Sequence, residues 1–261
     1  MKRIISTLLL FACVLFLFSC NKNNINTNGN KTAQARIHLT DGPAIYDHVY
    51  IDIQQIEITM SGGNSITLVP FRPGVYDILN FRNGLDTLLI NAALPVGSIN
   101  QIRLILGPNN SIVVNGNVYA LNTPSAQESG LKLNLGQTLA AGGAYDIWID
   151  FDAGKSILQT GSGSYKLKPV IRAYSSLTNG QIKGFILPLN AEAIVYATNG
   201  VDTFSAIPDP VTGSFVISGM TSGTYQLWVT PGLAGLNTYT QSDIVVSYGK
   251  QVDLGSITLH L

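Results

Sequence analysis

Three carboxylates and one indole recur at every second position of a short stretch near the middle of the chain. The sequence YDIWIDFD places Asp146, Trp148, Asp150 and Asp152 in this register. Side chains two positions apart on a β-strand point to the same side of the sheet. Carboxylate oxygens are ligands that Ca²⁺ prefers, and an indole among acids can receive a sugar by stacking and hydrogen bonding. The pattern therefore offers a face for calcium or for a carbohydrate.

The same residues also fit a structural role. Asp152 precedes the sequence AGKS at 153–156 and is well placed as the N-cap of a short helix. Acids on a strand face are commonly solvated or paired with a basic residue on the neighbouring strand, for which the sequence offers Lys166, Lys168 and Arg172. We expect this structural role, with the calcium and sugar sites as the alternatives.

Other patterns that would indicate catalysis are missing from the sequence. His38, His48 and His260 lie far apart, and no Cys/His pair has the spacing of a metal site. No G-x-S-x-G nucleophile motif occurs. We therefore predict no catalytic residue, no metal apart from the calcium alternative, and no enzymatic activity. The predicted function is a non-enzymatic binding, adhesion or scaffold module of unknown ligand. The alternative is a carbohydrate-active enzyme or a carbohydrate-binding accessory protein that uses the acidic Trp148 face, because the separation of catalytic carboxylates is a property of the fold.

The elements that position these residues are predicted to be strands. The chain of 261 residues has 26 glycines and is 46% hydrophobic but only 11% charged. Apolar and polar residues alternate in short segments between Gly, Pro and Asn turns, such as Asn115-Gly116, and a phase slip near Gln54-Gln55 indicates a β-bulge. On the central strand, Ile147, Ile149 and Phe151 would face a core and the acids would face water or a ligand. Such a pattern predicts an all-β fold.

A polar stretch at 175–180, SSLTNG, divides the strand pattern in two. Domain boundaries commonly fall in such segments. We predict two β-sandwich domains in tandem, the first over residues 35–176 and the second over 180–261. Residues 20–34 hold six asparagines and little apolar surface, a composition that does not offset the entropy of ordering, so they are predicted to form a flexible tether.

The N-terminus has the pattern of a targeting segment. Lys2 and Arg3 precede an apolar run at 4–18. The next residues complete the sequence LFSC at 17–20, which resembles a bacterial lipobox. This resemblance implies that residues 1–19 are a signal peptide and that Cys20 becomes the lipidated N-terminus. Two or more acyl chains make a stable anchor, so a membrane is the predicted partner.

The lipobox resemblance also predicts a location. Bacterial lipoproteins that are sorted to the outer membrane commonly avoid Asp after the lipidated cysteine, and Asn21 follows Cys20, so the predicted location is the outer membrane of the cell envelope. The sequence leaves open which side of that membrane the protein faces. The mature chain would keep 13 basic and 15 acidic side chains, a formal charge of −2. This balance offers no basic stripe for phosphates, so nucleic acid is excluded, whereas a glycan or an envelope protein remains a candidate partner.

Two stretches resemble known families. Separated motifs in the first domain are similar to a widespread bacterial lipoprotein family with the domain of unknown function numbered 4382; they are LTDGP at 39–43, QIRLIL at 101–106, TPSAQ at 123–127, DFDA at 150–153 and KPVIRA at 168–173. That resemblance spans about residues 35–175 and implies no established activity. The sequence DPVTGSFVISGMTSGTY at 209–225 resembles a carboxypeptidase regulatory-like, prealbumin-type sandwich over roughly the last eighty residues.

Replacing Cys20 with alanine should release the protein from membranes or leave it as uncleaved precursor. The physical reason is that no other long apolar segment follows residue 20. Membrane fractionation and labelling with radioactive palmitate measure this. Palmitate incorporation that is unchanged in Cys20→Ala would contradict the lipobox assignment.

Overall fold

The structure is a computed structural model that describes residues 31–42, 44–123, 129–161, 163–168 and 170–261. The predicted signal peptide, Cys20 and most of the predicted tether lie outside the described residues. Residues Thr32–Leu261 form one compact unit. Within the described ranges, no helix has both the length and the apolar character needed to cross a membrane.

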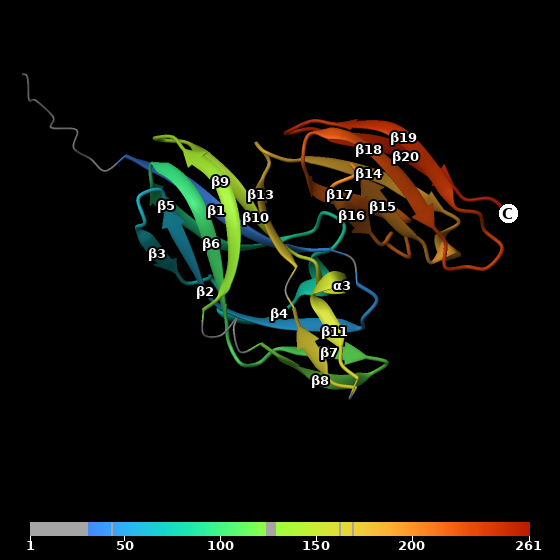
Figure 1. The fold of residues 1–261 in the computed structure, drawn as a ribbon, viewed down its shortest axis with the longest axis horizontal. Helices are drawn as coiled ribbons and strands as arrows, with labels where there is room; N and C mark the ends of the chain where they lie inside the picture. The colour runs from blue at the N-terminus through green and yellow to red at the C-terminus, as the bar shows by residue number, and fades with distance from the viewer. Residues whose placement is uncertain (1–30, 43, 124–128, 162, 169) are drawn as a thin grey trace, which may run out of the picture. The chain divides into compact units, whose positions relative to one another are not determined.

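The first part of the described chain is almost entirely β-structure (Figure 1). Its elements are β1 (Thr32–Asp41), β2 (His48–Met60), β3 (Ser65–Leu68), β4 (Gly74–Asp77), the 3₁₀ helix η1 (Ile78–Phe81), β5 (Thr87–Pro95), β6 (Gly97–Leu106), β7 (Ser111–Val114), β8 (Asn117–Asn122), β9 (Leu131–Leu139), β10 (Ala144–Phe151), α3 (Ala153–Ser156), β11 (Ile157–Gln159), β12 (Tyr165–Leu167) and β13 (Ile171–Ser175). One sheet has the order β13-β10-β1-β5. The other follows the order β11-β12-β8-β7-β2-β6-β9, with β3 and β4 also paired to β2.

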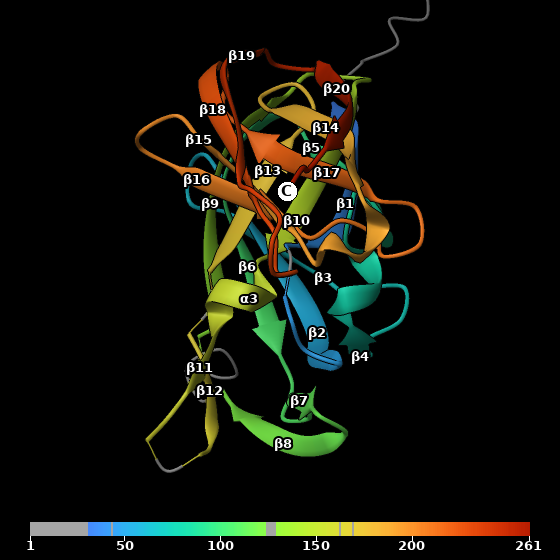
Figure 2. The same ribbon diagram turned by 90° about the vertical axis from the view of Figure 1, so that its right-hand side faces the viewer.

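The second part repeats this architecture on a smaller scale (Figure 2). Its elements are β14 (Gly180–Leu187), η2 (Leu189–Ala191), β15 (Ile194–Thr198), β16 (Thr203–Ala206), β17 (Ser214–Met220), β18 (Gly223–Thr230), β19 (Tyr239–Val246) and β20 (Gln251–Thr258). A three-stranded sheet, β17-β14-β20, and a four-stranded sheet, β16-β15-β18-β19, enclose its core. The fold is all-β with sandwich architecture, as the alternation in the sequence predicts.

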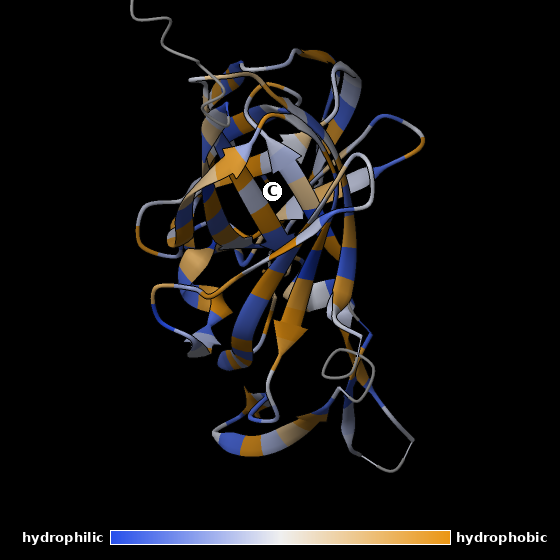
Figure 3. Ribbon diagram, turned by 90° about the vertical axis from the view of Figure 1, so that its left-hand side faces the viewer, coloured by the Kyte–Doolittle hydropathy of each residue, from blue (hydrophilic) through white to orange (hydrophobic). Residues whose placement is uncertain are grey.

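Two separate clusters of buried apolar residues fill the sandwiches. In the first, Ile37, Leu39, Ile147, Ile149 and Phe151 are all fully buried. The second cluster contains only residues from β14 onward. Figure 3 shows the hydrophobic and hydrophilic bands that alternate along the strands. The two-residue period of the sequence thus places one set of side chains in each core and the other set on an outer face.

Several local predictions are confirmed. Asn115 and Gly116 have φ angles of 50° and 74° and join β7 to β8 in a hairpin. The pairing of β2 with β6 shifts register between Ile53 and Gln55, which is the predicted bulge. The start of the first sandwich differs from the prediction, because β1 begins at Thr32 rather than at residue 35. Ala33 is buried and pairs with Leu94 of β5, so part of the predicted tether belongs to the sheet.

The fragment 180–261 should fold without the first sandwich, because its apolar cluster draws on no residue before β14. The expected result is a β-type circular dichroism spectrum and a single cooperative melt. A fragment that shows a random-coil spectrum, or that melts without a cooperative transition, would show that the predicted boundary does not separate independent domains.

Candidate functional site

The polar face of β10 gains its neighbours from the strands on either side. β1 runs parallel to β10 and β13 runs antiparallel to it. Register therefore fixes which side chains meet, and the pairs are Arg36 with Asp146, His38 with Trp148, Thr40 with Asp150, Trp148 with Tyr174, and Asp150 with Arg172. Each predicted site residue on β10 thus lies opposite a side chain able to hydrogen-bond, pair or stack with it.

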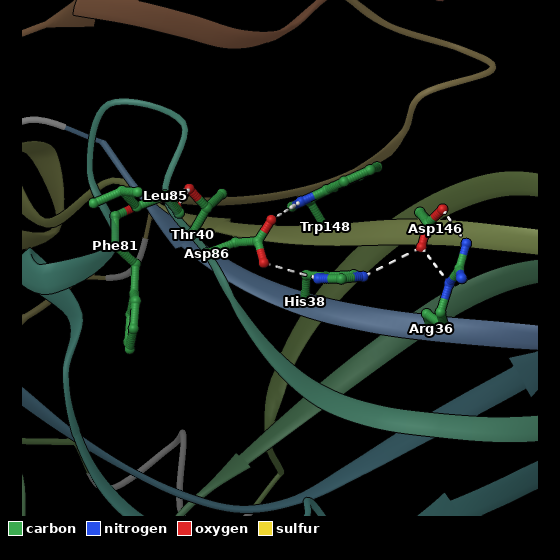
Figure 4. Close-up of polar contacts among 8 residues, drawn as sticks. All are labelled: Arg36, His38, Thr40, Phe81, Leu85, Asp86, Asp146 and Trp148. Carbon is green, nitrogen blue, oxygen red and sulfur yellow. Dashed lines mark hydrogen bonds and ion pairs between the residues drawn. The ribbon is translucent and has the colours of Figure 1, made fainter.

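The exposed half of this face is a chain of ion pairs and hydrogen bonds (Figure 4). Arg36 donates from Nε and Nη2 to the two carboxylate oxygens of Asp146, both at 2.6 Å. His38 places Nε2 3.3 Å from Oδ1 of Asp146 and Nδ1 2.9 Å from Oδ1 of Asp86. Ionised carboxylates accept hydrogen bonds but cannot donate them. His38 therefore donates to both acids at once only as the imidazolium, with a proton on each nitrogen.

Asp86 joins this chain from a loop rather than from a strand. Its second oxygen accepts a hydrogen bond of 2.9 Å from Nε1 of Trp148. The loop is held by Thr40, whose hydroxyl lies 2.9 Å from the carbonyl oxygen of Phe81 and 3.0 Å from that of Leu85 (Figure 4). The carboxylate of Asp86 thus orients both the imidazole and the indole.

Trp148 is flanked by rings on both sides. Its ring centroid lies 5.2 Å from that of His38 and 5.7 Å from that of Tyr174, with interplanar angles of 22° and 13°. The three residues come from adjacent strands in register, so the indole is the middle ring of a stacked ladder. A sugar that stacked on Trp148 would have to displace one of these neighbours, so the ladder is poorly suited to carbohydrate binding.

Electrostatics favour the ionised form of Asp146. Partial burial raises the pKa of Asp146, but the hydrogen bonds and positive charge of Arg36 and His38 outweigh it and hold the pKa below its usual value. This is the behaviour of an acid that stabilises the sheet by pairing.

The second half of the face is buried, which corrects the expectation that it looks onto water or a ligand. Asp150 is only 5% exposed, and its Oδ2 accepts a hydrogen bond of 2.5 Å from Nη2 of Arg172. The guanidinium of Arg172 also lies over the ring of Phe204, 4.4 Å from its centroid. Phe204 belongs to β16, so the second sandwich covers this end of β10. Arg172 is one of the three basic residues that the sequence offers as partners for these acids, and it pairs with Asp150.

Asp152 caps the short helix α3, as predicted. Its Oδ1 accepts a hydrogen bond of 3.1 Å from the backbone N–H of Lys155, and its Oδ2 lies 2.9 Å from Nζ of the same residue. The Lys155 ammonium also donates to the carbonyl oxygen of Thr203 in the second sandwich, at 3.3 Å. Asp152 therefore has a structural role at the end of β10.

Asp41 is the acid that the sequence did not single out. Parallel pairing brings the ends of β1 and β10 to the same edge, where Oδ1 of Asp41 accepts a hydrogen bond of 3.0 Å from the N–H of Ala153. Its Oδ2 is buried and has no hydrogen-bond partner among the described residues. A cavity of about 30 Å³, too small for a sugar ring, lies against Asp41, Asp150 and Asp152 and against two arginines, Arg82 and Arg172.

Burial raises the pKa of Asp41 well above its usual value. The Ala153 hydrogen bond opposes this rise, the negative charges of Asp150 and Asp152 add to it, and Arg82 partly offsets it. Burial also raises the pKa of Asp150, against the opposing effect of Arg172. The described residues contain no group of three or more His, Cys, Asp or Glu side chains placed to hold a metal ion.

Comparison with protein families identifies a family for this chain. The model of the family described as a domain of unknown function, DUF4382, matches residues 32–169. This range is more than half of the chain. The protein belongs to the DUF4382 family. Its DUF4382 domain contributes β1, β10 and the Asp86 loop to the polar face, whereas Arg172 and Tyr174 on β13 lie just beyond the matched range.

No curated protein matches the sequence. Solved structures give weak likenesses. They include a type II cohesin–X-dockerin complex from Acetivibrio cellulolyticus, with 22% identity over 31% of this chain and 56% of that chain and a TM-score of 0.25. A fimbrial protein from Bacteroides ovatus has 9% identity over 90% of this chain and 51% of that chain, with a TM-score of 0.26. The minor pilin GBS52 of Streptococcus agalactiae has 10% identity over 87% of this chain and 95% of that chain, with a TM-score of 0.23.

The chain thus spans about half the length of the first and second of these structures. Scores this low carry no argument about function. None of these likenesses tests the predicted carboxypeptidase regulatory-like resemblance of the last eighty residues, which remains a prediction.

Sequence patterns missed the partners that complete the site in the DUF4382 domain. Arg36 and His38 alternate with buried residues on β1, so a strand with a charged outer face was visible, but its pairing with β10 was not. Asp86 follows the Asn83-Gly84 turn, and no periodic signal marks it. Asp41 belongs to the sequence LTDGP, which carries the family resemblance but does not mark Asp41 as a buried acid.

Replacing Asp41 with asparagine should stabilise the protein at pH 8. The pKa of Asp41 is raised in the folded protein, so its carboxyl contributes fully to the stability of the fold below the usual pKa of about 3.9. This stabilisation is lost as the pH rises through the raised pKa. Asparagine keeps the acceptor for Ala153 and carries no buried charge. The expected gain is about 1–3 kcal/mol at pH 8, shrinking towards zero near pH 4, as measured by urea unfolding.

Asp253→Asn is the control, because the pKa of Asp253 is shifted in the opposite direction to that of Asp41. The N–H of Gly255 and the side chain of Lys183 lower the pKa of the exposed Asp253, so its contribution is present at neutral pH and is lost on acidification. This control should be less stable than the wild type at pH 8. If Asp41→Asn also proves less stable than the wild type at pH 8, the buried carboxyl contributes to stability in its ionised form and our assignment is wrong.

Proposed function

We propose that this protein is a lipid-anchored, non-enzymatic binding, adhesion or scaffold module of the bacterial cell envelope, held at the outer membrane through Cys20. The leader sequence supports the anchor, and the two sandwiches supply surfaces rather than a reaction centre. Membership of a family described only as a domain of unknown function assigns no activity that conflicts with this role.

One observation carries the non-enzymatic part of the proposal. All three carboxylates of the predicted face are engaged by protein groups: Asp146 by Arg36 and His38, Asp150 by Arg172, and Asp152 by Lys155. A glycosidase needs one carboxyl group free to donate a proton and a second free to act as base or nucleophile, roughly 5–10 Å apart across the scissile bond. Acids that are neutralised by neighbouring cations serve stability instead.

Incubating the purified protein with neutral and acidic polysaccharides should release no reducing ends above the buffer background. The reason is that the carboxylates of the Trp148 face are occupied by Arg36, His38, Arg172 and Lys155. A reducing-sugar assay measures the outcome, with Asp150→Asn as the matched variant. Release by the wild type that Asp150→Asn abolishes would favour the carbohydrate-active enzyme and contradict our proposal.

The location is tested separately. Density-gradient separation of the membranes should place the full-length protein in the outer-membrane fraction. Recovery in the inner-membrane fraction would contradict the proposed location without affecting the non-enzymatic assignment.

A further inference from the structure

The second sandwich carries an aromatic pair whose surroundings differ from those of Trp148. Tyr196 on β15 and Trp228 on β18 are register partners, and their rings stack with centroids 5.1 Å apart and an interplanar angle of 13°. Both side chains are partly exposed, whereas the adjacent Val195 and Leu227 are fully buried. The pair therefore stands on the outer face of the sheet formed by β16, β15, β18 and β19.

Among the described residues, the indole of Trp228 stacks with one ring, that of Tyr196. In the pairing of β18 with β19, the residue opposite Trp228 is Thr240, which is exposed. Trp148, by contrast, lies between His38 and Tyr174. A short threonine side chain cannot cover an indole face, so Trp228 offers a surface against which a flat ring can stack above Thr240.

The residues around this pair are polar but uncharged. The neighbouring rows on β15 and β18 pair Thr198 with Gln226, and Ile194 with Thr230. Gln226, Thr230 and Thr240 are exposed. Because these three side chains face solvent, their donors and acceptors are accessible to a ligand. None of these positions on β15 and β18 is Lys, Arg, His, Asp or Glu. On β19, the exposed Asp243 lies in the register shift opposite Gln226.

These features select one class of partner. An open indole face binds the C–H face of a sugar ring, while amide and hydroxyl groups match sugar hydroxyls. With no basic side chain in these rows and Asp243 as the one acid beside them, the surface gives no charge complementarity for nucleic acid or for a strongly charged peptide. We propose that this surface, formed by Tyr196, Gln226, Trp228, Thr230 and Thr240, binds a neutral glycan chain. The inference rests on the proposed binding role, but that role would survive its failure, because the experiment below tests one face only.

Affinity electrophoresis of the full-length protein tests the proposal. Native gels would contain hydroxyethyl cellulose, galactomannan or glycogen as neutral glycans, with polygalacturonate as the charged comparison and a detergent that lacks a sugar head group. We expect at least one neutral glycan to retard the protein. Trp228→Ala should weaken this binding by at least about tenfold, because the stacking surface is lost.

Two further variants make the result specific. Thr240→Arg places a long charged side chain beside the indole at an exposed position, and it should also weaken binding by at least about tenfold while leaving the melting temperature close to that of the wild type. Trp148→Phe keeps the ring ladder and should bind normally. It also leaves Trp228 as the only tryptophan of the chain, so that added glycan should change its fluorescence.

Three outcomes would overturn the proposal: no retardation by any of the three neutral glycans, retardation that survives both Trp228→Ala and Thr240→Arg, or retardation lost in Trp148→Phe alone. The first removes the ligand class, and the other two place binding elsewhere on the molecule. The reducing-end assay has a different readout, so failure here is distinguishable from failure of the non-enzymatic assignment.

Discussion

The parallel pairing of β1 with β10 is the interaction on which both halves of the polar face depend. It joins residues about 110 positions apart, as in the contact of Arg36 with Asp146. Because the two strands run in the same direction, their carboxyl ends meet at one edge, where Asp41 and Asp152 both accept hydrogen bonds from the first turn of α3. A slip of β1 by one residue would place Ile37 and Leu39 on the polar face and turn Arg36 and His38 into the core, so the apolar core fixes the register.

Arg172 connects this face to the second sandwich. Its guanidinium neutralises a buried acid of the first sandwich and lies on a buried ring of the second. An unpaired carboxylate at this depth would be strongly unfavourable, whereas a paired one still carries a desolvation cost. The raised pKa values of Asp41 and Asp150 reflect that cost. Arg172 thus links the two sandwiches through its ion pair with Asp150 and its contact with the ring of Phe204.

Sequence periodicity was a good guide to elements and a poor guide to their partners. The alternation on β10, the Asn115-Gly116 hairpin and the Asp152 cap all follow from local chemistry, because turn geometry, capping and side-chain direction depend on a few adjacent residues. The neighbours of Trp148 could not be read in this way. His38 and Asp86 reach it through strand order and a loop, which are properties of the whole sheet.

Burial of Asp150 could not be predicted for the same reason, since Phe204, which lies against its partner Arg172, belongs to another sandwich. The Tyr196–Trp228 pair shows the same limit. Both residues sit in regular alternation, but only the antiparallel register of β15 and β18 brings their rings together.

The position of β1 within its sheet has a mechanical consequence. The described chain enters the fold at Thr32 as a strand with neighbours on both sides, β10 and β5, and each neighbour is aligned with it over eight register pairs. In a protein held at its N-terminus, a pulling force would act along this inner strand. Extracting it would require shearing two hydrogen-bond ladders at once, whereas an edge strand would resist with only one.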